Sequence, residues 1–422
     1  MRWRCTLKAR RQLEHARNTH PELWDTCFDD RLLAVPLLRL APQDAPPEGV
    51  RLVPKDDARP EGDPYTADLL AGYPHVIAAA TCGGIYRLIK ARWDNRHLFG
   101  HDFCDLLLLD EASQLSLPEA MMAALPLRPD GQLLVVGDPR QMPPIVQHDW
   151  KREARRTFRQ YRAYDSLFDA LAPLRPPRVG FARSFRLHSV LAELLRQEVY
   201  QHDGIAYHSQ QTEQMPPQEH GDPFVAAVLA AHYPLIVLVH DEAASQHVNA
   251  FETGLIGPVL QALTCPDGHA LDAEKGFGVV VPHRAQRVSL RRAYPQLTVT
   301  DPATGQEIRS AVDTVERYQG DERDVILVSA TESDPDYLLA SAGFLLEPRR
   351  LTVALSRAKR KLILVASRSI FEFFTTDEEL FLCSQLWKNL LRRACTDLLW
   401  EGDRDGVRVR IYGCPTNGKE MP

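Results

Sequence analysis

The feature that most limits the fold of this chain is an apolar run, Leu106–Leu109, followed directly by Asp110 and Glu111. Four apolar residues without a turn signal predict a fully buried strand of a parallel sheet. Side chains at the carboxyl end of such a strand lie where open α/β sheets bind ligands. One acid there can hold Mg²⁺ while the next deprotonates a water, which suits nucleotide hydrolysis. Taken alone, the pair is better explained as an acidic helix start, which the helix dipole favours.

A second predicted strand, Gln132–Val136, strengthens the ligand-site interpretation because it lies about one βαβ unit after the first. The helix predicted between them covers residues 116–125 and has Pro118 and Glu119 in its first turn. Because parallel strands end at the same edge of a sheet, both following loops are expected together. Gln141, in the second loop, is then placed to hydrogen-bond a phosphate or the attacking water.

Two neighbouring stretches leave their function open. The predicted strand Val76–Ala80 ends on Thr81 and the pair Gly83-Gly84, which suits either close approach to a phosphate or a plain strand-to-helix turn. In isolation the turn is favoured. Residues 151–162 carry six basic side chains at helical spacing, which suits a solvated face and a phosphate-backbone contact equally.

The second half of the chain predicts another parallel α/β domain after a proline-rich linker at residues 173–177. Strands predicted at 235–239, 278–281, 325–329 and 362–366 alternate with helices at 249–263 and 349–359. Acids on one domain and arginines on the other suggest a nucleotide held between them, with Arg186 and Arg357 as arginine fingers. Such fingers contribute about 10³ to 10⁵ in rate, although each arginine alone is more often in a surface ion pair.

Composition limits the class and the compartment. A chain of 422 residues with 44% hydrophobic and 25% charged residues suits two or three soluble domains. The eight cysteines form no C-x-x-C pair, which argues against zinc or iron–sulfur binding and for a reducing, cytoplasmic setting. No apolar stretch is long enough to cross a bilayer, so no membrane partner is expected. The net charge of -6 leaves room for a local basic groove.

Six sequence motifs in order resemble motifs II to VI of superfamily 1 helicases. They are LLLLDEASQL, VVGDPRQMPP, SFRLH, VVVPHRAQ, TVERYQGDERDVILVS and RRLTVALSRAK. The resemblance is greatest to the 5′-to-3′ branch that includes the nonsense-mediated-decay helicase, senataxin and the replication nuclease–helicase. The DEASQ form and the spacing of QG-x-E before RRL-x-VAL-x-RAK are specific to that branch, and the resemblance covers residues 76–367.

The resemblance implies an α/β fold with two RecA-like parallel-sheet domains in tandem, the first of them incomplete. Its expected divisions are a poorly defined N-terminal segment (1–75), a partial first domain (76–175), a second domain (176–370) and a C-terminal tail (371–422).

The resemblance also implies an ATP-dependent helicase or translocase that uses ATP and Mg²⁺ and binds single-stranded DNA or RNA. Asp110 would bind Mg²⁺, Glu111 would be the catalytic base and Gln141 would sense the γ-phosphate, with Arg186 and Arg357 as fingers. By position, the nucleotide cleft would be lined by Gln319, Gly320 and Glu322. The nucleic-acid strand would be tracked by Thr81, His283, Gln286 and Thr314.

One departure from the family concerns the phosphate loop, because G-x-x-x-x-G-K-[ST] occurs nowhere in the sequence. The backbone and lysine of that loop hold the phosphates in the family. The chain is therefore expected to be the C-terminal part of a longer helicase, weak or inactive alone and completed by a missing N-terminal part, so its status as an enzyme stays open. The alternative is a non-hydrolysing module that binds single-stranded nucleic acid or a partner. An unrecognised phosphate loop in residues 1–75 is disfavoured, because no glycine-rich turn follows a strand there.

Overall fold

The computed structural model describes residues 3–40, 48–90, 92–93, 96–97, 103–144, 165–300, 307–318 and 321–415. The chain divides into two compact units. Unit 1 comprises residues 1–139 and 143–176, and unit 2 comprises residues 140–142 and 177–422. The division after Pro176 falls inside the predicted linker. The basic stretch at 151–162 lies outside the described residues.

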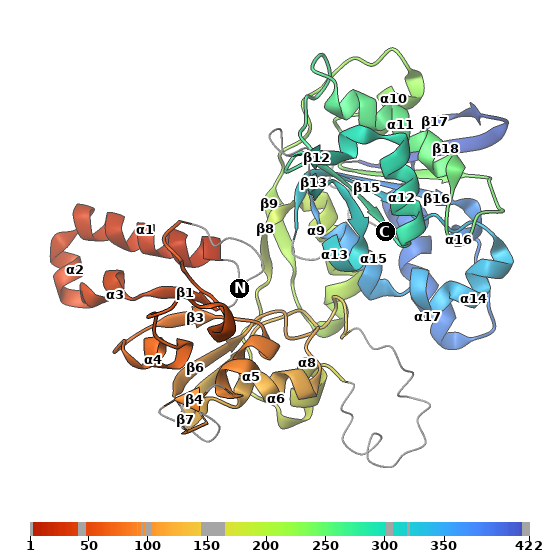
Figure 1. Ribbon diagram of the computed structural model, residues 1–422. Helices are drawn as coiled ribbons and strands as arrows, with labels where there is room; N and C mark the ends of the chain where they lie inside the picture. Colours follow the sequence, from red (N-terminus) through yellow and green to blue (C-terminus); the bar gives the residue numbers. More distant parts are fainter. Residues whose placement is uncertain are drawn as a thin grey trace. The chain divides into compact units, whose positions relative to one another are not determined.

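Unit 2 is built on a seven-stranded sheet of order β14-β11-β15-β16-β10-β18-β17 (Figure 1). The first five strands in this order pair in parallel, whereas β18 pairs antiparallel with β10 and β17 antiparallel with β18. Their bounds are β10 (Leu235–His240), β11 (Phe277–Val281), β14 (Val312–Thr314), β15 (Arg323–Ser329), β16 (Ala358–Ser367), β17 (Asp397–Arg404) and β18 (Val407–Cys414). The predicted second α/β domain is therefore confirmed, and its sheet is extended by a C-terminal hairpin.

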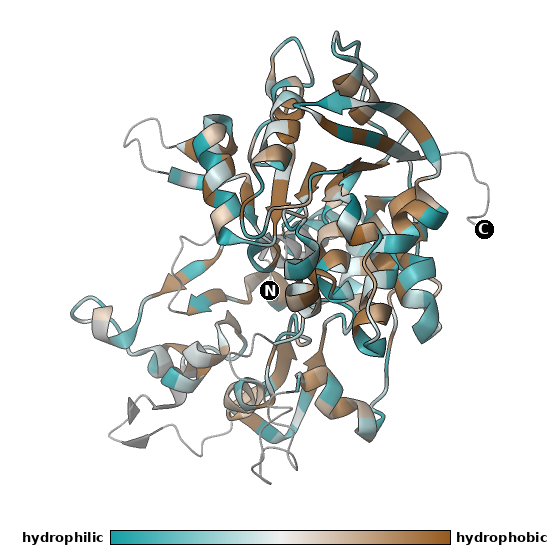
Figure 2. Cartoon of the chain, turned by 90° about the vertical axis from the view of Figure 1, so that its right-hand side faces the viewer, coloured by the Kyte–Doolittle hydropathy of each residue, from teal (hydrophilic) through white to brown (hydrophobic). Residues whose placement is uncertain are grey.

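The central strands of this sheet are buried on both faces. All residues of β10 and β11 are buried, as are nearly all of β15 and β16. Their valine, isoleucine and leucine side chains form two core clusters, and Figure 2 shows hydrophobic residues along these interior strands. Continuous apolar runs are what a parallel sheet covered by helices requires.

Helices connect and cover the strands of unit 2. Their bounds are α9 (Ser189–Leu195), α10 (Pro223–Val228), α11 (Ala250–Thr264), α12 (Arg284–Ala293), α13 (Val315–Tyr318), α14 (Pro335–Leu345), α15 (Pro348–Leu355), α16 (Arg368–Phe371) and α17 (Glu378–Asn389). The helix predicted at 349–359 ends earlier than expected, because Ala358 already pairs with Arg323 in the sheet. Two small strand pairs complete the unit: β8 (Arg183–His188) with β9 (His208–Gln211), and β12 (Thr298–Thr300) with β13 (Glu307–Ser310).

Unit 1 contains smaller sheets. Parallel strands β2 (Arg51–Val53), β1 (Leu37–Leu40) and β3 (Ile77–Ala79) form one sheet, and β6 (Cys104–Leu109) and β7 (Leu127–Val135) form a parallel pair. Strands β4 (Arg92–Trp93) and β5 (Arg96–His97) make a short antiparallel pair. The helices are α1 (Trp3–Thr19), α2 (Pro21–Cys27), α3 (Arg31–Ala34), α4 (Thr66–Ala71), α5 (Cys82–Lys90), α6 (Leu117–Ala124) and α8 (Leu167–Leu171). Helix α6 starts as predicted, because Ser116 and Glu119 form a capping box.

The expectation that the strands of motifs II and III are fully buried is wrong for this structure. Leu106 is 57% exposed, and Leu133 and Leu134 are 44% and 49% exposed. Successive strand residues point to opposite faces, so both faces of β7 are only partly covered. Within the described residues, β6 and β7 pair only with each other. Leu109 is buried, because it packs against Ala112, Ala120 and Leu167 beyond the strand end.

Candidate functional site

In unit 1 the loops after β6 and β7 meet, as the spacing of motifs II and III predicts. The Ala112 N–H donates to the carbonyl oxygen of Val136 at 2.9 Å. A Cβ on Gly137 would lie 2.9 Å from the Ala112 nitrogen, so only glycine fits without a shift. Asp110 and Glu111 are both exposed at this edge.

The two acids are presented on a sharp turn. Glu111 has a φ of 53°, in the left-handed region that non-glycine residues rarely adopt. Its N–H donates to Asp110 Oδ1 at 3.1 Å. Backbone strain of this kind is characteristic of functional positions and costs about 1–3 kcal/mol.

The acids fit a Mg²⁺ site of the kind that nucleotides complete. Mg²⁺ keeps several waters and is usually held by one or two carboxylates plus substrate phosphates. Over the described ranges, no three His, Cys, Asp or Glu side chains gather to hold a metal. An exposed Asp110 at the carboxyl end of a parallel strand agrees with such an open site.

Thr81 belongs to a plain strand-to-helix turn. Its Oγ1 accepts a hydrogen bond from the Gly84 N–H at 3.1 Å, and Gly83 and Gly84 are already in the first turn of α5. The Thr81 side chain is exposed. The structure therefore favours the simpler of the two interpretations for the glycine pair, and Thr81 keeps its expected surface position.

In unit 2 the first predicted arginine finger lies in a cluster of charges. Arg186 Nε donates to Glu322 Oε2 at 2.6 Å, and Lys359 Nζ lies 3.1 Å from Glu322 Oε1. All three side chains are about one-third exposed. Burial acts to raise the pKa of Glu322, but the positive charges of Arg186 and Lys359 outweigh burial and lower it. Glu322 is therefore an anion that bridges two cations.

The second predicted finger is held against the motif III glutamine. Arg357 is only 3% exposed. Its Nη2 donates to Gln141 Oε1 and to Ser356 Oγ, both at 2.9 Å, and its Nε donates to the Val353 carbonyl oxygen at 2.9 Å. Gln141 belongs to the short segment 140–142 that groups with unit 2.

Neighbours of Gln141 fix this segment on unit 2. Arg140 Nε donates to Asp203 Oδ2 at 2.6 Å, and Met142 is buried in a core cluster together with Leu187. The structure thus brings together Gln141 and Arg357, two residues that lie 216 positions apart in the sequence.

Gln286 occupies a different position from the one expected of a residue that contacts nucleic acid. It has no exposed surface. Its Oε1 accepts from the Asn249 N–H at 2.9 Å, and its Nε2 donates to Ser329 Oγ at 3.2 Å. In this conformation Gln286 cannot contact a nucleic-acid strand directly, because its side-chain oxygen and nitrogen both form hydrogen bonds within unit 2. Thr314 is likewise buried, with 8% exposure.

His283 remains near the surface and is held on several sides. Its Nε2 lies 2.7 Å from Glu332 Oε1, and the Glu332 carboxylate is fully buried and also accepts from Ser341. The imidazole stacks on Phe344 with ring centroids 5.7 Å apart. Thr331, just before Glu332, has a φ of 68°, and its N–H donates to Glu252. This strained turn fixes the carboxylate that orients His283.

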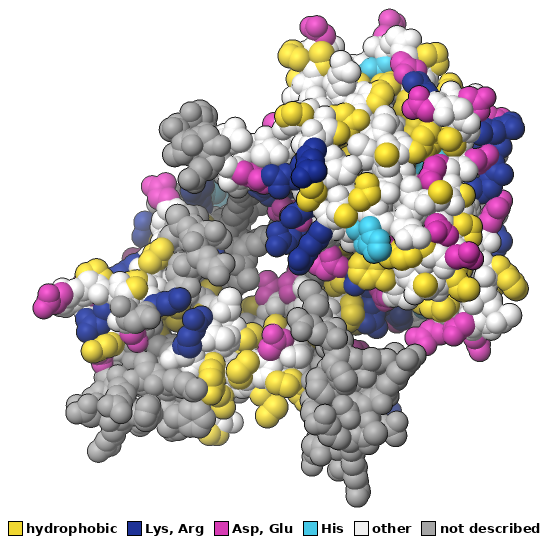
Figure 3. Space-filling model, turned by 45° about the vertical axis from the view of Figure 1, so that its right-hand side comes forward, with side chains coloured by type: hydrophobic (Ala, Val, Ile, Leu, Met, Phe, Trp, Pro, Cys, Tyr) yellow, Lys and Arg dark blue, Asp and Glu magenta, His cyan; other side chains and the backbone are white. Residues whose placement is uncertain are grey.

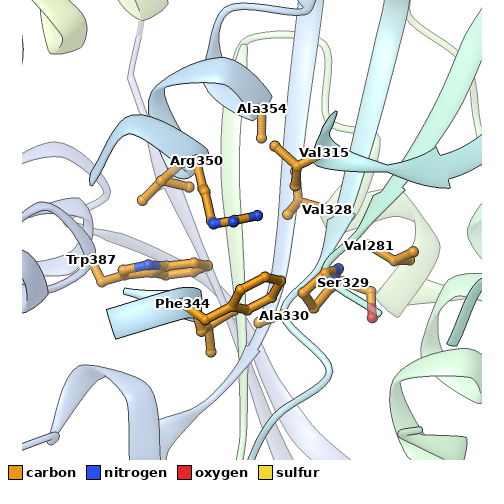
Figure 4. A pocket seen from close by; sticks show the side chains of 12 residues that line it. Val281, Val315, Val328, Ser329, Ala330, Phe344, Arg350, Ala354 and Trp387 are labelled. Carbon is orange, nitrogen blue, oxygen red and sulfur yellow. The ribbon is translucent and has the colours of Figure 1, made fainter. Parts of the chain in front are cut away.

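A small cavity lies beside this group, lined by strand ends and by α14, α15 and α17 (Figure 4). It has a volume of ≈ 30 Å³, which is room for about two water molecules. The guanidinium of Arg350 lies 3.9 Å from the centre of the Phe344 ring and pairs with Glu316. Trp387 is also in the lining, and its buried Nε1 has no hydrogen-bond partner among the described residues. The cavity is too small for a nucleotide.

Two residues at the charged cluster were missed by the sequence analysis. Lys359 follows the Arg357 finger by two positions, and Phe185, 79% exposed, directly precedes Arg186. Successive strand residues point to opposite faces, so Phe185 and Arg186 lie on opposite faces of β8, and the guanidinium of Arg183 lies 4.7 Å from the centre of the Phe185 ring. Adjacency to a motif arginine was the available signal for both. Gln319 and Gly320 lie outside the described residues.

Comparison with known proteins identifies the class. A family model described as an AAA domain matches residues 163–369. The chain is 29% identical to the DNA replication ATP-dependent helicase/nuclease DNA2 of Mus musculus, over 71% of this chain and 27% of that protein. It is 26% identical to the putative helicase mov-10-B.1 of Danio rerio, over 79% of this chain and 33% of that protein.

These matches confirm the resemblance drawn from the motifs: the chain is a relative of superfamily 1 helicases. It spans about a quarter to a third of the length of these two relatives. Among solved structures, the arterivirus nonstructural protein 10 helicase matches 79% of this chain and 53% of its own, at 12% identity and a TM-score of 0.33. Among the described helices, none combines the length and apolar character needed to cross a membrane.

Proposed function

We propose that this chain provides the strand-binding and ATP-hydrolysing parts of a superfamily 1 helicase-type motor. The observation that supports this most directly is the contact between Arg357 and Gln141, because it joins a predicted finger to the predicted γ-phosphate sensor. Arg357 is buried, so its guanidinium needs hydrogen-bond partners, and the motif III glutamine supplies one of them. Arg186 lies in the same unit, held by Glu322.

The proposed chemistry divides between the units. Asp110 binds the metal, and Mg²⁺ neutralises charge on the phosphates when it is bound. Glu111 takes a proton from the attacking water, and Gln141 orients that water or the γ-phosphate. Arg186 and Arg357 stabilise the negative charge that develops on the transferred phosphoryl group.

The proposed partner is single-stranded DNA or RNA. His283 lies at the start of α12, whose sequence contains Arg284, Arg287, Arg291 and Arg292. Figure 3 shows arginine and lysine side chains at several places on the surface of unit 2, interspersed with acidic ones. Such side chains bind the phosphate backbone with strong salt dependence. In this proposal Gln286 and Thr314 are buried under this surface and stabilise it, and they do not contact the nucleic acid.

The test is ATP hydrolysis by the purified chain, with and without single-stranded DNA or RNA. We expect Asp110→Asn and Arg357→Gln to lower the rate at least a hundredfold, because both remove charge from the reacting phosphates. Glu119→Gln, in the neighbouring helix cap, is the matched control and should keep the rate. A rate that Asp110→Asn leaves unchanged would refute the assignment of the motif II acids.

The missing phosphate loop favours a second candidate, a module that binds a strand without hydrolysis. It predicts salt-dependent binding of single-stranded nucleic acid that ATP does not alter. One outcome is that the chain binds single-stranded nucleic acid without hydrolysing ATP. In that case a fused N-terminal segment that carries the phosphate loop of a relative should restore hydrolysis, provided that the chain is part of a motor. Continued inactivity of a well-folded fusion would favour the binding module.

A further inference from the structure

The three-residue cluster of Arg186, Glu322 and Lys359 has the composition of a phosphate site that is filled by a carboxylate of the chain itself. Glu322 places one oxygen 2.6 Å from Arg186 Nε and the other 3.1 Å from Lys359 Nζ. A phosphate group offers the same kind of acceptor oxygens, with more negative charge. The cluster carries one more cation than it has anions.

We propose that Arg186 and Lys359 together bind the phosphate chain of the nucleotide, and that Glu322 occupies their donors until the nucleotide replaces it. This proposal rests on the proposed function, since it names a further ligand of the same nucleotide. It assigns Lys359 a role that its motif does not, and it makes Glu322 a competitor of phosphate at this position.

The position of Lys359 is fixed by the sheet. Strand β16 begins at Ala358, which pairs with Arg323, and the Arg323 N–H donates to the Arg357 carbonyl oxygen at 3.1 Å. Lys359 is therefore the second residue of a strand whose remaining residues are mostly buried. Rigid elements hold binding groups more accurately than loops do. Lys359 lies two residues from the Arg357 finger, on the same rigid segment.

The ammonium group of Lys359 is chemically suited to bind phosphate. In P-loop proteins a lysine reaches the β- and γ-phosphates as a compact point charge, so an ammonium group is a suitable ligand for phosphate. Lys359 supplies an ammonium group beside Arg186, where the γ-phosphate is proposed to bind. Because the lowered pKa of Glu322 keeps the carboxylate ionised, phosphate must displace an anion.

The experiment measures binding of inorganic tripolyphosphate and of ATP to the purified full chain by calorimetry, at low and at moderate salt. Tripolyphosphate has no sugar or base, so it reports the phosphate contacts alone. We expect Lys359→Gln to weaken tripolyphosphate binding about two- to fivefold, the range of a partly exposed ion pair. Glu322→Gln should strengthen it by a similar factor, because the competing charge is gone.

Lys275→Gln is the matched control, because Lys275 is an exposed lysine before β11, outside the cluster. The Lys275→Gln variant should bind tripolyphosphate as tightly as the unaltered chain does. All variants that are compared should have the same midpoint temperature of thermal unfolding. The inference is overturned if Lys359→Gln binds tripolyphosphate as the control does. It is also overturned if Glu322→Gln weakens binding, since that shows the three residues to be a structural unit.

The outcomes separate this inference from the proposed function. Opposite shifts for the two variants, in a chain that does not hydrolyse ATP even when it is fused to a phosphate loop, support the phosphate site and refute the motor. Hydrolysis that Arg357→Gln abolishes but Lys359→Gln leaves unchanged, together with unaltered tripolyphosphate binding, supports the motor and refutes the role of Lys359.

Discussion

At the scale of single residues, burying a charged side chain away from water lowers the free energy of unfolding, and Lys361 is the example. Lys361, on β16, is 1% exposed, and its ammonium donates to the carbonyl oxygens of Ala230 at 2.8 Å and Tyr233 at 2.6 Å. Burial lowers the pKa of Lys361 from 10.5 to about 7. The partners are carbonyl dipoles rather than carboxylates, so the charge is only partly compensated.

The free energy of unfolding should therefore rise with pH because of Lys361. Between about pH 7 and about pH 10 the unfolded chain keeps a proton that the folded chain has lost, so increasing pH favours the folded state. The slope is up to about 1.4 kcal/mol per pH unit. Urea denaturation at pH 6 to 9 should show that the free energy of unfolding of the unaltered chain rises with pH relative to that of Lys361→Met. Parallel curves, like those expected for Lys275→Met, would contradict the assignment.

At the scale of elements, the residues that cap the N-termini of helices differ in how far they are buried. Asn249 caps α11 by accepting from the Glu252 N–H at 2.8 Å, and its amide also donates to Glu242 and to the Thr331 carbonyl oxygen. It has no exposed surface. Asp377 caps α17 by accepting from the Leu380 N–H at 3.0 Å, but it lies at the surface.

Asn249→Ala should destabilise the chain more than Asp377→Ala does. Losing either cap costs about 1 kcal/mol, but Asn249→Ala also removes the Asn249 donor from the carbonyl oxygen of the fully buried Thr331, which adds about 1–3 kcal/mol. Chemical denaturation measures both variants under the same conditions. Equal losses would mean that the buried network around Asn249 relaxes or admits water.

At the scale of the whole molecule, the two units differ in how completely their sheets are covered. Unit 2 buries its central strands on both faces, whereas unit 1 leaves Leu106, Leu133 and Leu134 about half exposed on a two-stranded pair. Stability in a protein follows such differences, since regions with few buried contacts open first.

Native-state hydrogen exchange should show this difference. Amides of β10, β11, β15 and β16 are expected to exchange only through global unfolding of unit 2, whereas amides of β6 and β7 should exchange at least a hundredfold faster through local opening. Thermal unfolding should then show two transitions rather than one. A single transition with equal protection of β6 and β16 would contradict this prediction.

Local patterns predicted much of the fold because each was consistent with its environment. The run Leu106–Leu109 formed a parallel strand, and the helix after it began where it was predicted, at a capping box formed by Ser116 and Glu119. The turn-rich stretch 201–222 shows no strand pattern in the sequence, yet His208–Gln211 pairs with β8. That strand has no alternation of apolar residues, so only its long-range partner defines it.

The sequence by itself determined the class of the protein and the chemistry that its motif residues can perform. Order and spacing of acids, glutamine and arginines are local properties, and they identified a helicase relative before any contact was known. The tertiary structure decided which of those residues are exposed and which are buried. Burial and pairing depend on residues hundreds of positions away, such as Gln141 beside Arg357. For that reason Gln286 became a buried support, and Lys359 joined the charged cluster.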